Sequence, residues 1–567
     1  MFSPIHATSD SIGDTIMAVE GQRARLDGRH FHVLVIGGGI NGVAIARECA
    51  RAGKHVLLVE QNDFASGVTS RSTRIIHGGL RYLEHAELGL VRESLRERGR
   101  LLREKSHLVH PLHFLLLLNE GSQRSALKIR VGLWLYRRLA GKRARRGGGE
   151  VDLARLERAL DAGHRWSFFP YEDAQCEYPE RLVAEWFMEA AAAGAVIRNY
   201  TEALAVDVSQ GRVRGVLLRD RLSGHEERVN ATWVINCTGP WADRICQRST
   251  IRTHQPMVGG VRGSHIILPR FPGSPSAAIY TEAADRRPIF VLPWAEQVMV
   301  GTTEVADTGD PGKAVPSAEE IGYLLSSAAR IFPQANISAQ TIRYAFAGVR
   351  PLPYCDSKNL AAVTRRHLLH DHSEDGASRM LSVIGGKLTT AAALARECAR
   401  KMGLSANQPQ VIAMANGSAL DPVLDEAVLQ IAGVGGISED SARGMVEWHG
   451  QRAFEIARAA RESADLRAPI CPHTSHLVAE AAEAYRREFA VTLGDVLLRR
   501  VPVALGPCWS AACSREAALR IASVLGWNDK TMGRNLEAFE MERSMFLRPA
   551  IQAEPAVEDA AIWGNRS

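Results

Sequence analysis

Residues 31–60 read FHVLVIGGGINGVAIARECARAGKHVLLVE. Val33–Ile36 is a continuous apolar run, as a buried parallel strand requires, and the pattern G-x-G-x-x-G starts directly after it at Gly37. These glycines allow a tight turn, the close approach of a pyrophosphate and the packing of the next helix on the strand. A second strand over Val56–Val59 ends at Glu60, where an acid can hold a ribose hydroxyl. The stretch predicts a site for an adenine dinucleotide, with a purely structural glycine turn as the alternative.

The length of 567 residues predicts three or four domain-sized units. We expect residues 1–30 to be an N-terminal extension. A discontinuous dinucleotide-binding domain should span 31–404, with a substrate-binding sheet domain inserted at about 165–230 and 255–350. After about residue 405 the pattern becomes helical, which predicts a C-terminal all-helical domain over 405–567. The predicted fold class is therefore α/β, Rossmann-like, with an antiparallel substrate domain and a helical domain.

The cysteines indicate a reducing compartment. There are nine of them, an odd number, and none forms a C-x-x-C pair. Cys508 and Cys513 lie five residues apart in a polar, Trp-containing segment. We interpret all nine as reduced thiols of a cytosolic protein, and no cluster of metal ligands has a usable spacing.

One segment is strongly basic. Between Gly121 and Gly149 the chain has nine Lys and Arg residues and no acid, with apolar and aromatic residues interleaved. Such a segment can lie on anionic lipid; the alternative is a helix packed on the core and followed by a solvated basic loop. No nucleic-acid-binding module surrounds it, so nucleic acid is not an expected partner. Residues 1–30 lack the apolar core of a signal peptide, and no apolar run is long enough to span a membrane.

Further motifs follow the dinucleotide stretch along the chain. They are SGVTSRSTR (66–74), HGGLRYLE (77–84), VINCTGPW (234–241), GSH (263–265), GTTE (301–304), GVRPL (348–352), GGKLTT (385–390) and TLGDVLLRR (492–500). In order and spacing the chain closely resembles the FAD-dependent glycerol-3-phosphate dehydrogenase family over roughly residues 30–545.

The resemblance implies FAD as cofactor and the oxidation of sn-glycerol 3-phosphate to dihydroxyacetone phosphate, with the hydride passing to flavin N5. It also implies that the electrons go to ubiquinone or another membrane quinone, from a cytoplasmic enzyme that associates peripherally with the inner membrane and can form a homodimer. The residues expected to bind the cofactor are Gly37, Gly39, Asn41, Gly42, Glu60, Thr69, Ser70, Ser72, His77, Gly78, Gly239, Gly385, Gly386, Leu388 and Thr389.

The reaction needs a phosphate clamp, an acceptor for the hydroxyl proton and cations that stabilise developing negative charge. Arginine matches phosphate oxygens with a planar fork. The expected catalytic residues are His265 as general base, Arg350 and Lys387, with His77 as the competing base. The expected substrate-binding residues are Arg81, Tyr82, Thr302, Thr303 and Arg365.

The chain also departs from the family pattern. Glu304 stands where aspartate is common, and CEYPERL over Cys176–Leu182 replaces a more acidic sequence. These changes leave two other enzyme functions open: an oxidase that uses oxygen, and a flavoenzyme that acts on another hydroxy or amino acid. A third reading is a catalytically silent flavin-binding scaffold whose helical domain binds a partner.

Overall fold

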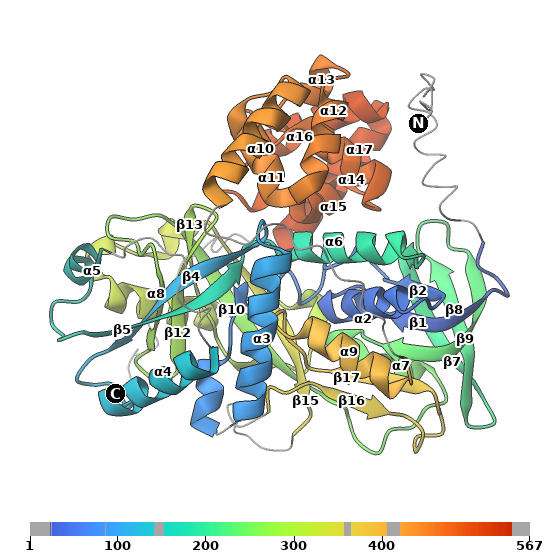
Figure 1. Ribbon diagram of the computed structural model, residues 1–567, viewed down its shortest axis with the longest axis horizontal. Helices are drawn as coiled ribbons and strands as arrows, with labels where there is room; N and C mark the ends of the chain where they lie inside the picture. Colours follow the sequence, from blue (N-terminus) through green and yellow to red (C-terminus); the bar gives the residue numbers. More distant parts are fainter. Residues whose placement is uncertain are drawn as a thin grey trace, which may run out of the picture.

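The computed structural model describes residues 23, 25–85, 87–140, 152–355, 364–404 and 420–546. Two β-sheets lie side by side, and a group of helices covers them from one side (Figure 1). This arrangement confirms the predicted α/β fold class with its helical C-terminal region. Residues 1–22 of the expected extension lie outside the described part of the chain.

The first sheet carries the glycine turn. Its strand β1 (His30–Ile36) pairs in parallel with β2 (Val56–Val59) and with β9 (Glu226–Asn236), and β17 (Met380–Ile384) extends the sheet in parallel beyond β9. The other strands of this sheet are β6 (Val196–Arg198), β7 (Thr201–Ser209), β8 (Arg212–Asp220) and β16 (Leu368–Asp371). Strands from both halves of the chain therefore end at one edge, which is where ligands bind in such sheets.

Three helices pack together on one face of the first sheet (Figure 1). Helix α2 (Ile40–Arg51) begins at the glycine turn and lies between α6 (Pro179–Ala192) and α9 (Ala391–Lys401). Small and β-branched residues of α2, such as Ala46 and Val43, are fully buried and let these helices approach closely. The glycine turn is therefore held between a rigid strand and a rigid helix.

The second sheet has the order β14-β10-β13-β12-β11-β4-β5-β3, with β15 paired to the other side of β10. Its pairing is antiparallel except between β11 and β4. Its strands are β3 (Ile75–Ile76), β4 (Val109–Leu118), β5 (Ser167–Cys176), β10 (Val258–Pro269), β11 (Ala278–Glu282), β12 (Pro288–Trp294), β13 (Gln297–Gly301), β14 (Val305–Ala306) and β15 (Tyr344–Pro353). The long strand β10 places His265 between Gly301 of β13 and Phe346 of β15.

The division between the two sheets differs from the expected boundaries. The hairpin β7–β8 falls within the range 165–230 assigned to the substrate domain, but β8 pairs with β9 in the first sheet. Short alternating strands identify a hairpin but not the sheet that it joins, because that choice depends on contacts remote in sequence.

The helices outside the first sheet's helical layer divide into two groups. Those between residues 80 and 331 are α3 (Leu88–Glu104), α4 (Ala126–Ala140), α5 (Leu153–Ala159), α7 (Ala242–Arg248) and α8 (Ala318–Ile331). Those of the C-terminal region are α10 (Leu420–Gly435), α11 (Glu439–His449), α12 (Ala453–Ala460), α13 (Ala464–Arg467), α14 (Val478–Arg487), α15 (Leu493–Asp495), α16 (Ala511–Leu525) and α17 (Asp529–Phe546). Across the described ranges, none of the helices combines the length and the apolar composition that crossing a bilayer would take.

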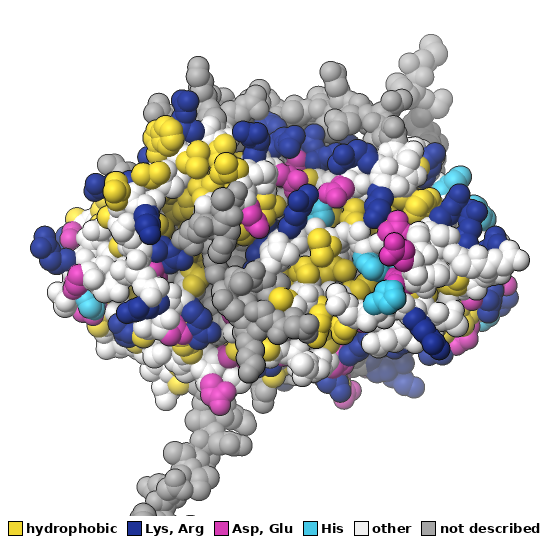
Figure 2. Space-filling view, turned by 90° about the horizontal axis from the view of Figure 1, so that it is seen from below, with side chains coloured by type: hydrophobic (Ala, Val, Ile, Leu, Met, Phe, Trp, Pro, Cys, Tyr) yellow, Lys and Arg dark blue, Asp and Glu magenta, His cyan; other side chains and the backbone are white. Residues whose placement is uncertain are grey.

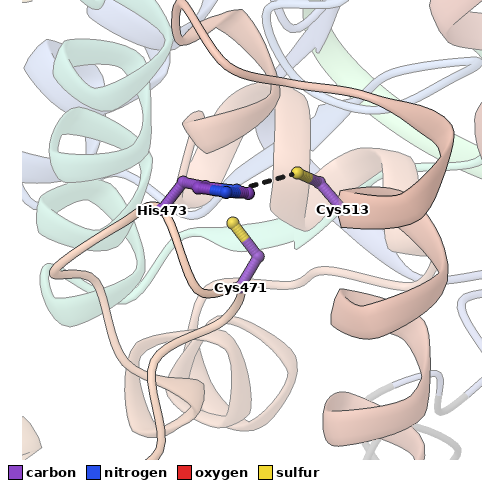
Figure 3. Close-up of side chains that lie close together, drawn as sticks. All are labelled: Cys471, His473 and Cys513. Atoms are coloured by element: carbon purple, nitrogen blue, oxygen red, sulfur yellow. Dashed lines mark hydrogen bonds between the residues drawn. The ribbon is translucent and has the colours of Figure 1, made fainter.

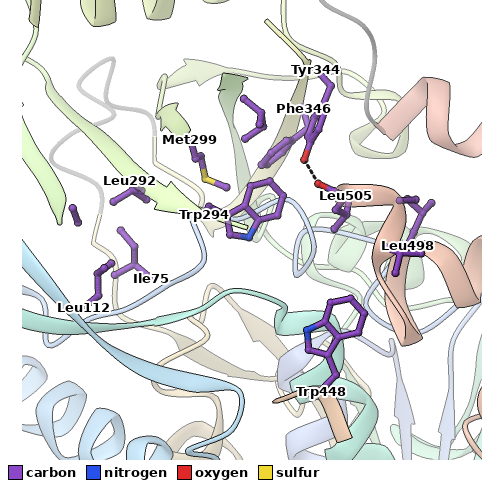
Figure 4. Packing of buried hydrophobic residues seen from close by; sticks show 14 of the residues in the cluster. Ile75, Leu112, Leu292, Trp294, Met299, Tyr344, Phe346, Trp448, Leu498 and Leu505 are labelled. Atoms are coloured by element: carbon purple, nitrogen blue, oxygen red, sulfur yellow. Dashed lines mark hydrogen bonds between the residues drawn. The ribbon is translucent and has the colours of Figure 1, made fainter. Parts of the chain in front are cut away.

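The helical region packs on the second sheet through a buried apolar cluster (Figure 4). Leu498 and Leu505 belong to this cluster together with Trp294 of β12 and Tyr344 of β15. The hydroxyl of Tyr344 donates to the backbone oxygen of Leu505 at 2.8 Å. Shared apolar burial and a satisfied hydrogen bond make this contact continuous with the core of the sheet.

A buried ion cluster joins the helical region to the first sheet. Asp63, just after β2, accepts from Arg499 Nε at 2.5 Å and from Arg500 Nη1 and Nη2 at 2.8 and 2.7 Å. All three side chains are almost fully buried. Burial alone would raise the pKa of Asp63, but the two guanidinium groups outweigh it and hold that pKa below its ordinary value of 3.8. The carboxylate is thus charged and fully paired.

Asp63→Ala is expected to destabilise the protein by about 3–5 kcal/mol, because it leaves the buried Arg500 without its carboxylate partner and Arg499 with only Asp495 and Glu542. Asp207→Ala is the matched control, since Asp207 pairs with Arg228 on the surface, and it should cost less than about 1 kcal/mol. Urea unfolding of the two variants measures both values. Because the folded pKa of Asp63 is depressed, its contribution is present above about pH 4 and is lost as the pH falls further. Equal losses in both variants would contradict this assignment.

Candidate active site

A cavity of about 1300 Å³ starts at the glycine turn and extends to the face of the second sheet. It exceeds the roughly 300–1,000 Å³ of a typical small-molecule site, so it has room for a long cofactor with a small substrate beside it. Most of the predicted site residues line it. They are Gly37, Gly39, Asn41, Glu60, Thr69, Ser72, His77, Tyr82, Gly239, His265, Arg350, Arg365, Gly385, Gly386, Lys387, Leu388 and Thr389.

The glycine turn has the shape that a pyrophosphate requires. Gly37 has a φ of +109°, and a Cβ at Gly42 would lie 1.9 Å from the Gly37 backbone oxygen, so only glycine fits at either position. The N-cap residue of α2, Gly39, offers no side-chain hydrogen bond. Backbone N–H groups of the first turn therefore face the cavity, where an anion can accept from them.

Glu60 closes the turn from the end of β2. Its carboxylate accepts from Gly38 N at 2.7 Å and from Asn62 N at 2.9 Å. Burial raises the pKa of Glu60, and these two backbone hydrogen bonds oppose that shift. The remaining lone pairs of the carboxylate can accept from the hydroxyls of a ribose.

The hydroxyl-rich loop 66–74 forms the next part of the wall. The Thr69 hydroxyl accepts from Ile40 N at 3.1 Å and thereby meets the first turn of α2. The Ser72 hydroxyl accepts from Arg74 N at 3.2 Å and lines the cavity. Ser70 instead donates to the Gly67 backbone oxygen at 3.0 Å, which stabilises the loop from behind. Of the two serines, Ser72 is the one placed to contact a ligand.

Gly385 and Gly386 form a second turn at the end of β17, with φ values of +78° and +97°. The Asn41 amide donates to the Gly385 backbone oxygen at 3.1 Å. A Cβ at Gly386 would lie 2.3 Å from that amide nitrogen, so the two turns meet too closely for any side chain. This contact joins the predicted cofactor residues from the two ends of the domain.

The HGG turn packs against the second turn. His77 N donates to the Thr389 hydroxyl at 3.1 Å, and Gly78 N donates to Asp173 Oδ1 at 3.1 Å. Gly78 does not line the cavity. A Cβ at this position would lie 2.3 Å from the Leu95 side chain, so glycine is needed here for packing. Burial lowers the pKa of His77 to about 4, so its ring is neutral near physiological pH.

Lys387 brings an uncompensated cation to the cavity. Its Nζ is buried, has no hydrogen-bond partner among the described residues and lies 4.0 Å from the ring centroid of Tyr82. Burial lowers the pKa of Lys387 to about 8, an effect that Glu87 and Glu93 oppose and Arg365 reinforces. A buried ammonium without an acceptor points to an anionic or oxygen-bearing ligand.

Two arginines approach the same end of the cavity. Arg350 on β15 donates from Nη2 to the Thr302 hydroxyl at 2.8 Å. Arg365 donates from Nη2 to Glu304 Oε1 at 2.7 Å, so the glutamate that departs from the family pattern holds this arginine in place. The backbone of Arg81 lies in the 3₁₀-helix Leu80–His85, but its side chain lies outside the described part of the chain.

His265 is buried beside Arg350. Its Nε2 shares a hydrogen bond of 3.0 Å with the Thr73 hydroxyl, and its ring stacks on Phe346 with centroids 5.0 Å apart. Nδ1 has no partner among the described residues. Burial, with the charges of Arg350 and Arg74, lowers the pKa of His265 to about 3. The neutral ring can accept a proton, and an anion bound nearby would raise its basicity.

Thr302 and Thr303 were expected to bind the substrate, but their side chains contact other residues of the chain. Thr302 contacts Arg350, as given above, but neither threonine is part of the cavity wall. The Thr303 hydroxyl donates to Glu320 Oε1 at 2.6 Å and accepts from Ser264 N at 2.9 Å, so it is engaged both as a donor and as an acceptor. Thr303 is therefore bound within the sheet, and Thr302 acts through the arginine that it orients.

The comparisons with known proteins agree with this geometry. A family model described as FAD dependent oxidoreductase matches residues 32–400, and one described as the C-terminal domain of alpha-glycerophosphate oxidase matches residues 377–532. A glycerol-3-phosphate dehydrogenase of Synechocystis sp. is 36% identical over 494 residues, which cover 84% of this chain and 89% of that protein. The chain belongs to the FAD-dependent glycerol-3-phosphate dehydrogenase family. It is accordingly an FAD-dependent oxidoreductase.

Two further relatives bear on the fold and on the range of the family. D-erythritol 1-phosphate dehydrogenase of Brucella abortus is 36% identical over 363 residues, which cover 63% of this chain and 70% of that protein. The solved structure of glycerol-3-phosphate dehydrogenase from Bacillus halodurans, complexed with FAD, has a TM-score of 0.74 and 24% identity. It covers 96% of this chain and all of that chain, so this family member has the same fold over nearly its whole length.

Three residues of this family member were not singled out from the sequence. Thr73 orients His265, and Asp173 holds the HGG turn while also accepting from Tyr136 at 2.7 Å. Glu180 forms two hydrogen bonds of 2.9 Å with the buried Arg74 and so anchors the loop 66–74. Thr73 lies in the hydroxyl-rich loop 66–74, whereas Asp173 and Glu180 act through partners about 100 residues away, which no local pattern identifies.

Proposed function

We propose that this protein oxidises sn-glycerol 3-phosphate to dihydroxyacetone phosphate with FAD as hydride acceptor, and passes the electrons to a membrane quinone. The observation that carries the proposal is the convergence of Arg350, Arg365 and Lys387 with the neutral His265 at one end of the cavity. The other end of that cavity begins at the glycine turn that suits a dinucleotide. Cations beside a hydride acceptor match a phosphorylated alcohol.

The residues fit FAD from one end of the cavity to the other. The N-terminus of α2, whose N-cap Gly39 has no side chain to accept from it, would bind the pyrophosphate, with Gly37, Gly39 and Gly42 allowing its approach, and Glu60 would bind the adenosine ribose. The turn Gly385–Thr389 would lie against the isoalloxazine, as its two positive-φ glycines leave the backbone open there. When bound, FAD supplies the hydride acceptor.

The chain's own residues bind and orient the substrate. Arg350 presents a planar fork to the phosphate, and the Thr302 hydroxyl keeps that fork in position. Arg365, in the segment just before β16, adds a second positive charge at the cavity wall. Lys387 carries the cation that stabilises negative charge on the reacting oxygen or on the reduced cofactor.

His265 would take the hydroxyl proton. Its Nδ1 has no partner among the described residues, and it can accept the proton in the tautomer whose Nε2–H donates to the Thr73 hydroxyl. A pKa of about 3 makes this ring a weak base in the absence of a bound anion. A phosphate dianion on Arg350 favours the protonated ring, so substrate binding itself would raise the pKa of His265 toward a useful value. His77 remains the alternative base, with its pKa near 4 and Lys387 beside it.

The decisive experiment is anaerobic reduction of the purified flavoprotein. Added glycerol 3-phosphate should bleach the flavin absorbance of the wild type. Arg350→Ala should lower kcat/KM by roughly 10- to 150-fold, which corresponds to about 1.5–3 kcal/mol for a lost charged hydrogen bond. Arg214→Ala, an exposed arginine on β8, is the matched control and should change neither quantity.

The outcomes separate the alternatives. No bleaching by glycerol 3-phosphate but bleaching by D-erythritol 1-phosphate would replace the substrate and keep the reaction class. No bleaching by either compound in the FAD-loaded protein would overturn the proposal. Peroxide released in stoichiometric amount during turnover, in place of quinone reduction, would make the protein an oxidase.

Lys387 predicts an alkaline limb in the pH profile. Its charge is present below a pKa of about 8, so kcat/KM should fall as the pH rises through that value. Lys387→Met should be slower throughout and lack this limb, whereas Lys387→Arg keeps its charge and should move the limb to higher pH. Initial rates from about pH 6 to 10 give the profiles. An unchanged limb in Lys387→Met would assign it to another group.

We further propose that α4 docks the protein on the membrane that holds the quinone. Leu127, Val131 and Trp134 are 71%, 57% and 62% exposed at helical spacing, while Ile129 and Leu133 on the opposite side are buried. Exposed Arg130, Arg137 and Arg138 lie on the same helix. The face of the molecule that includes this region has hydrophobic side chains gathered beside Lys and Arg (Figure 2). Residues 141–151 of the basic segment lie outside the described part of the chain.

Replacing Leu127, Val131 and Trp134 together by serine should weaken binding to anionic vesicles by at least about tenfold, since each such side chain contributes about 1.5–3 kcal/mol when it leaves water. Vesicle co-sedimentation at low salt measures this. Leu429→Ser, at an equally exposed leucine of α10, is the control. Wild-type protein that ignores anionic vesicles would contradict the proposal. A triple variant that changes only the solution mass would assign the face to a homodimer contact instead.

A further inference from the structure

Two thiols and an imidazole point toward one another in the helical domain (Figure 3). Cys471 and His473 lie on the segment between α13 and α14, and Cys513 lies in the first turn of α16. From spacing along the chain we expected no cluster of metal ligands. The structure brings these residues together because the two segments, some 40 residues apart in the chain, pack side by side.

The spacing of the donor atoms matches a tetrahedral metal site. One ligand atom from each residue lies within 4.8 Å of the other two, and Cys513 Sγ lies 3.5 Å from His473 Nδ1. Zinc–sulfur bonds of about 2.3 Å and zinc–nitrogen bonds of about 2.0–2.1 Å at a tetrahedral angle separate S and N donors by about 3.6 Å. Small side-chain movements therefore suffice to close the three ligands on one ion.

A fourth thiol stands at the edge of this cluster. The thiol of Cys508 donates to the His473 backbone oxygen at 4.0 Å, and the Cys508 backbone oxygen accepts from the Cys513 thiol at 3.7 Å. The Cys508 side chain is exposed, so a rotation can carry its sulfur inward. A Cys₃His set is a common ligand set of structural zinc sites.

We propose that Cys471, His473 and Cys513 bind a zinc ion, with Cys508 as the fourth ligand. Thiolate and imidazole donors select zinc and other thiophilic ions over Mg²⁺ and Ca²⁺, which prefer oxygen. The Ser510 hydroxyl donates to Cys513 Sγ at 3.4 Å, the kind of outer contact that orients a ligand sulfur. Buried Cys471 and Cys513 shield the ion from one side, and exposed His473 provides its route of entry.

A second group, His370, His372 and Asp375, does not carry the same inference. Asp375 Oδ2 lies 2.7 Å from a ring nitrogen of each histidine, and the other nitrogen of His372 lies 2.7 Å from the Ser382 hydroxyl. Its donors are already satisfied by one another. In the cysteine cluster, by contrast, the contacts are sulfur contacts of 3.4 Å and longer, which a metal ion would replace with stronger bonds.

The zinc ion would have a structural role. None of its ligands lines the active-site cavity. The ligand Cys508 directly follows the segment whose Leu505 backbone oxygen accepts from Gln297 at 3.0 Å and from Tyr344 at 2.8 Å. Binding would fix this segment to α16 and to the loop of Cys471. The ion therefore clamps the part of the helical domain that contacts the second sheet.

Metal analysis of the FAD-loaded protein, purified without chelators, tests the proposal. The wild type should hold about one zinc per chain after dialysis. Cys471→Ser and Cys513→Ser should each lose nearly all of it, and Cys355→Ser, at an exposed cysteine outside the cluster, should retain it. Thermal unfolding should occur at a lower temperature in the two ligand variants than in Cys355→Ser.

A second measurement needs no variant and so remains valid if the ligand variants fail to fold. A mercurial that titrates thiols should release one zinc from the wild type, and Co²⁺ in its place should show the intense visible bands of tetrahedral thiolate coordination. Wild-type protein without stoichiometric zinc, both as purified and after incubation with Zn²⁺, would overturn the proposal. So would zinc retained in both ligand variants, or a Cys471–Cys513 disulfide found by mass spectrometry.

Discussion

The buried pairing of Asp63 with Arg499 and Arg500 is the contact on which the architecture depends. It joins the loop after β2, which lines the cavity beside Glu60, to the C-terminal helical region. Buried charges cost several kcal/mol each in desolvation, so this docking position is favourable only when all three groups meet. An apolar contact tolerates sliding, whereas a bidentate ion pair does not. We therefore regard the cluster as a device that sets the position of the helical domain over the cofactor site.

The end of the cavity at Arg350, Arg365 and Lys387 differs from the Asp63 cluster, because its positive charge is not fully balanced by carboxylates. Lys387 has no acceptor among the described residues, and the ring of His265 is kept neutral by burial and neighbouring guanidinium groups. A desolvated positive cavity favours an anion strongly and a neutral polyol weakly. The carboxylate of Glu304 pairs with Arg365 and so reduces the net positive charge of this end of the cavity. The proposed preference for a phosphorylated substrate thus rests on electrostatics as much as on shape.

The structure places the glycine turn, the hydroxyl loop and Gly385–Gly386, which local patterns selected, around one cavity, because the conformation of each depends on neighbours in sequence. Local patterns failed where a role depends on remote contacts. The hairpin β7–β8 was expected in the second sheet but pairs with the first. Thr303 was expected to bind the substrate, but its hydroxyl is hydrogen-bonded to Glu320. The cysteine cluster was missed for the same reason. Spacing rules for metal sites assume ligands from one motif, and here they come from two segments.

The hydrogen bond from Asn41 to Gly385 has a consequence for biosynthesis. It spans 344 residues, and β17 must pair with β9 before the two turns can meet. While the ribosome is still translating the middle of the chain, the first turn has no opposite wall, so we expect the nascent protein to bind FAD weakly. Cofactor capture is therefore a late event, and prematurely terminated chains should be left as apoprotein for proteases to remove.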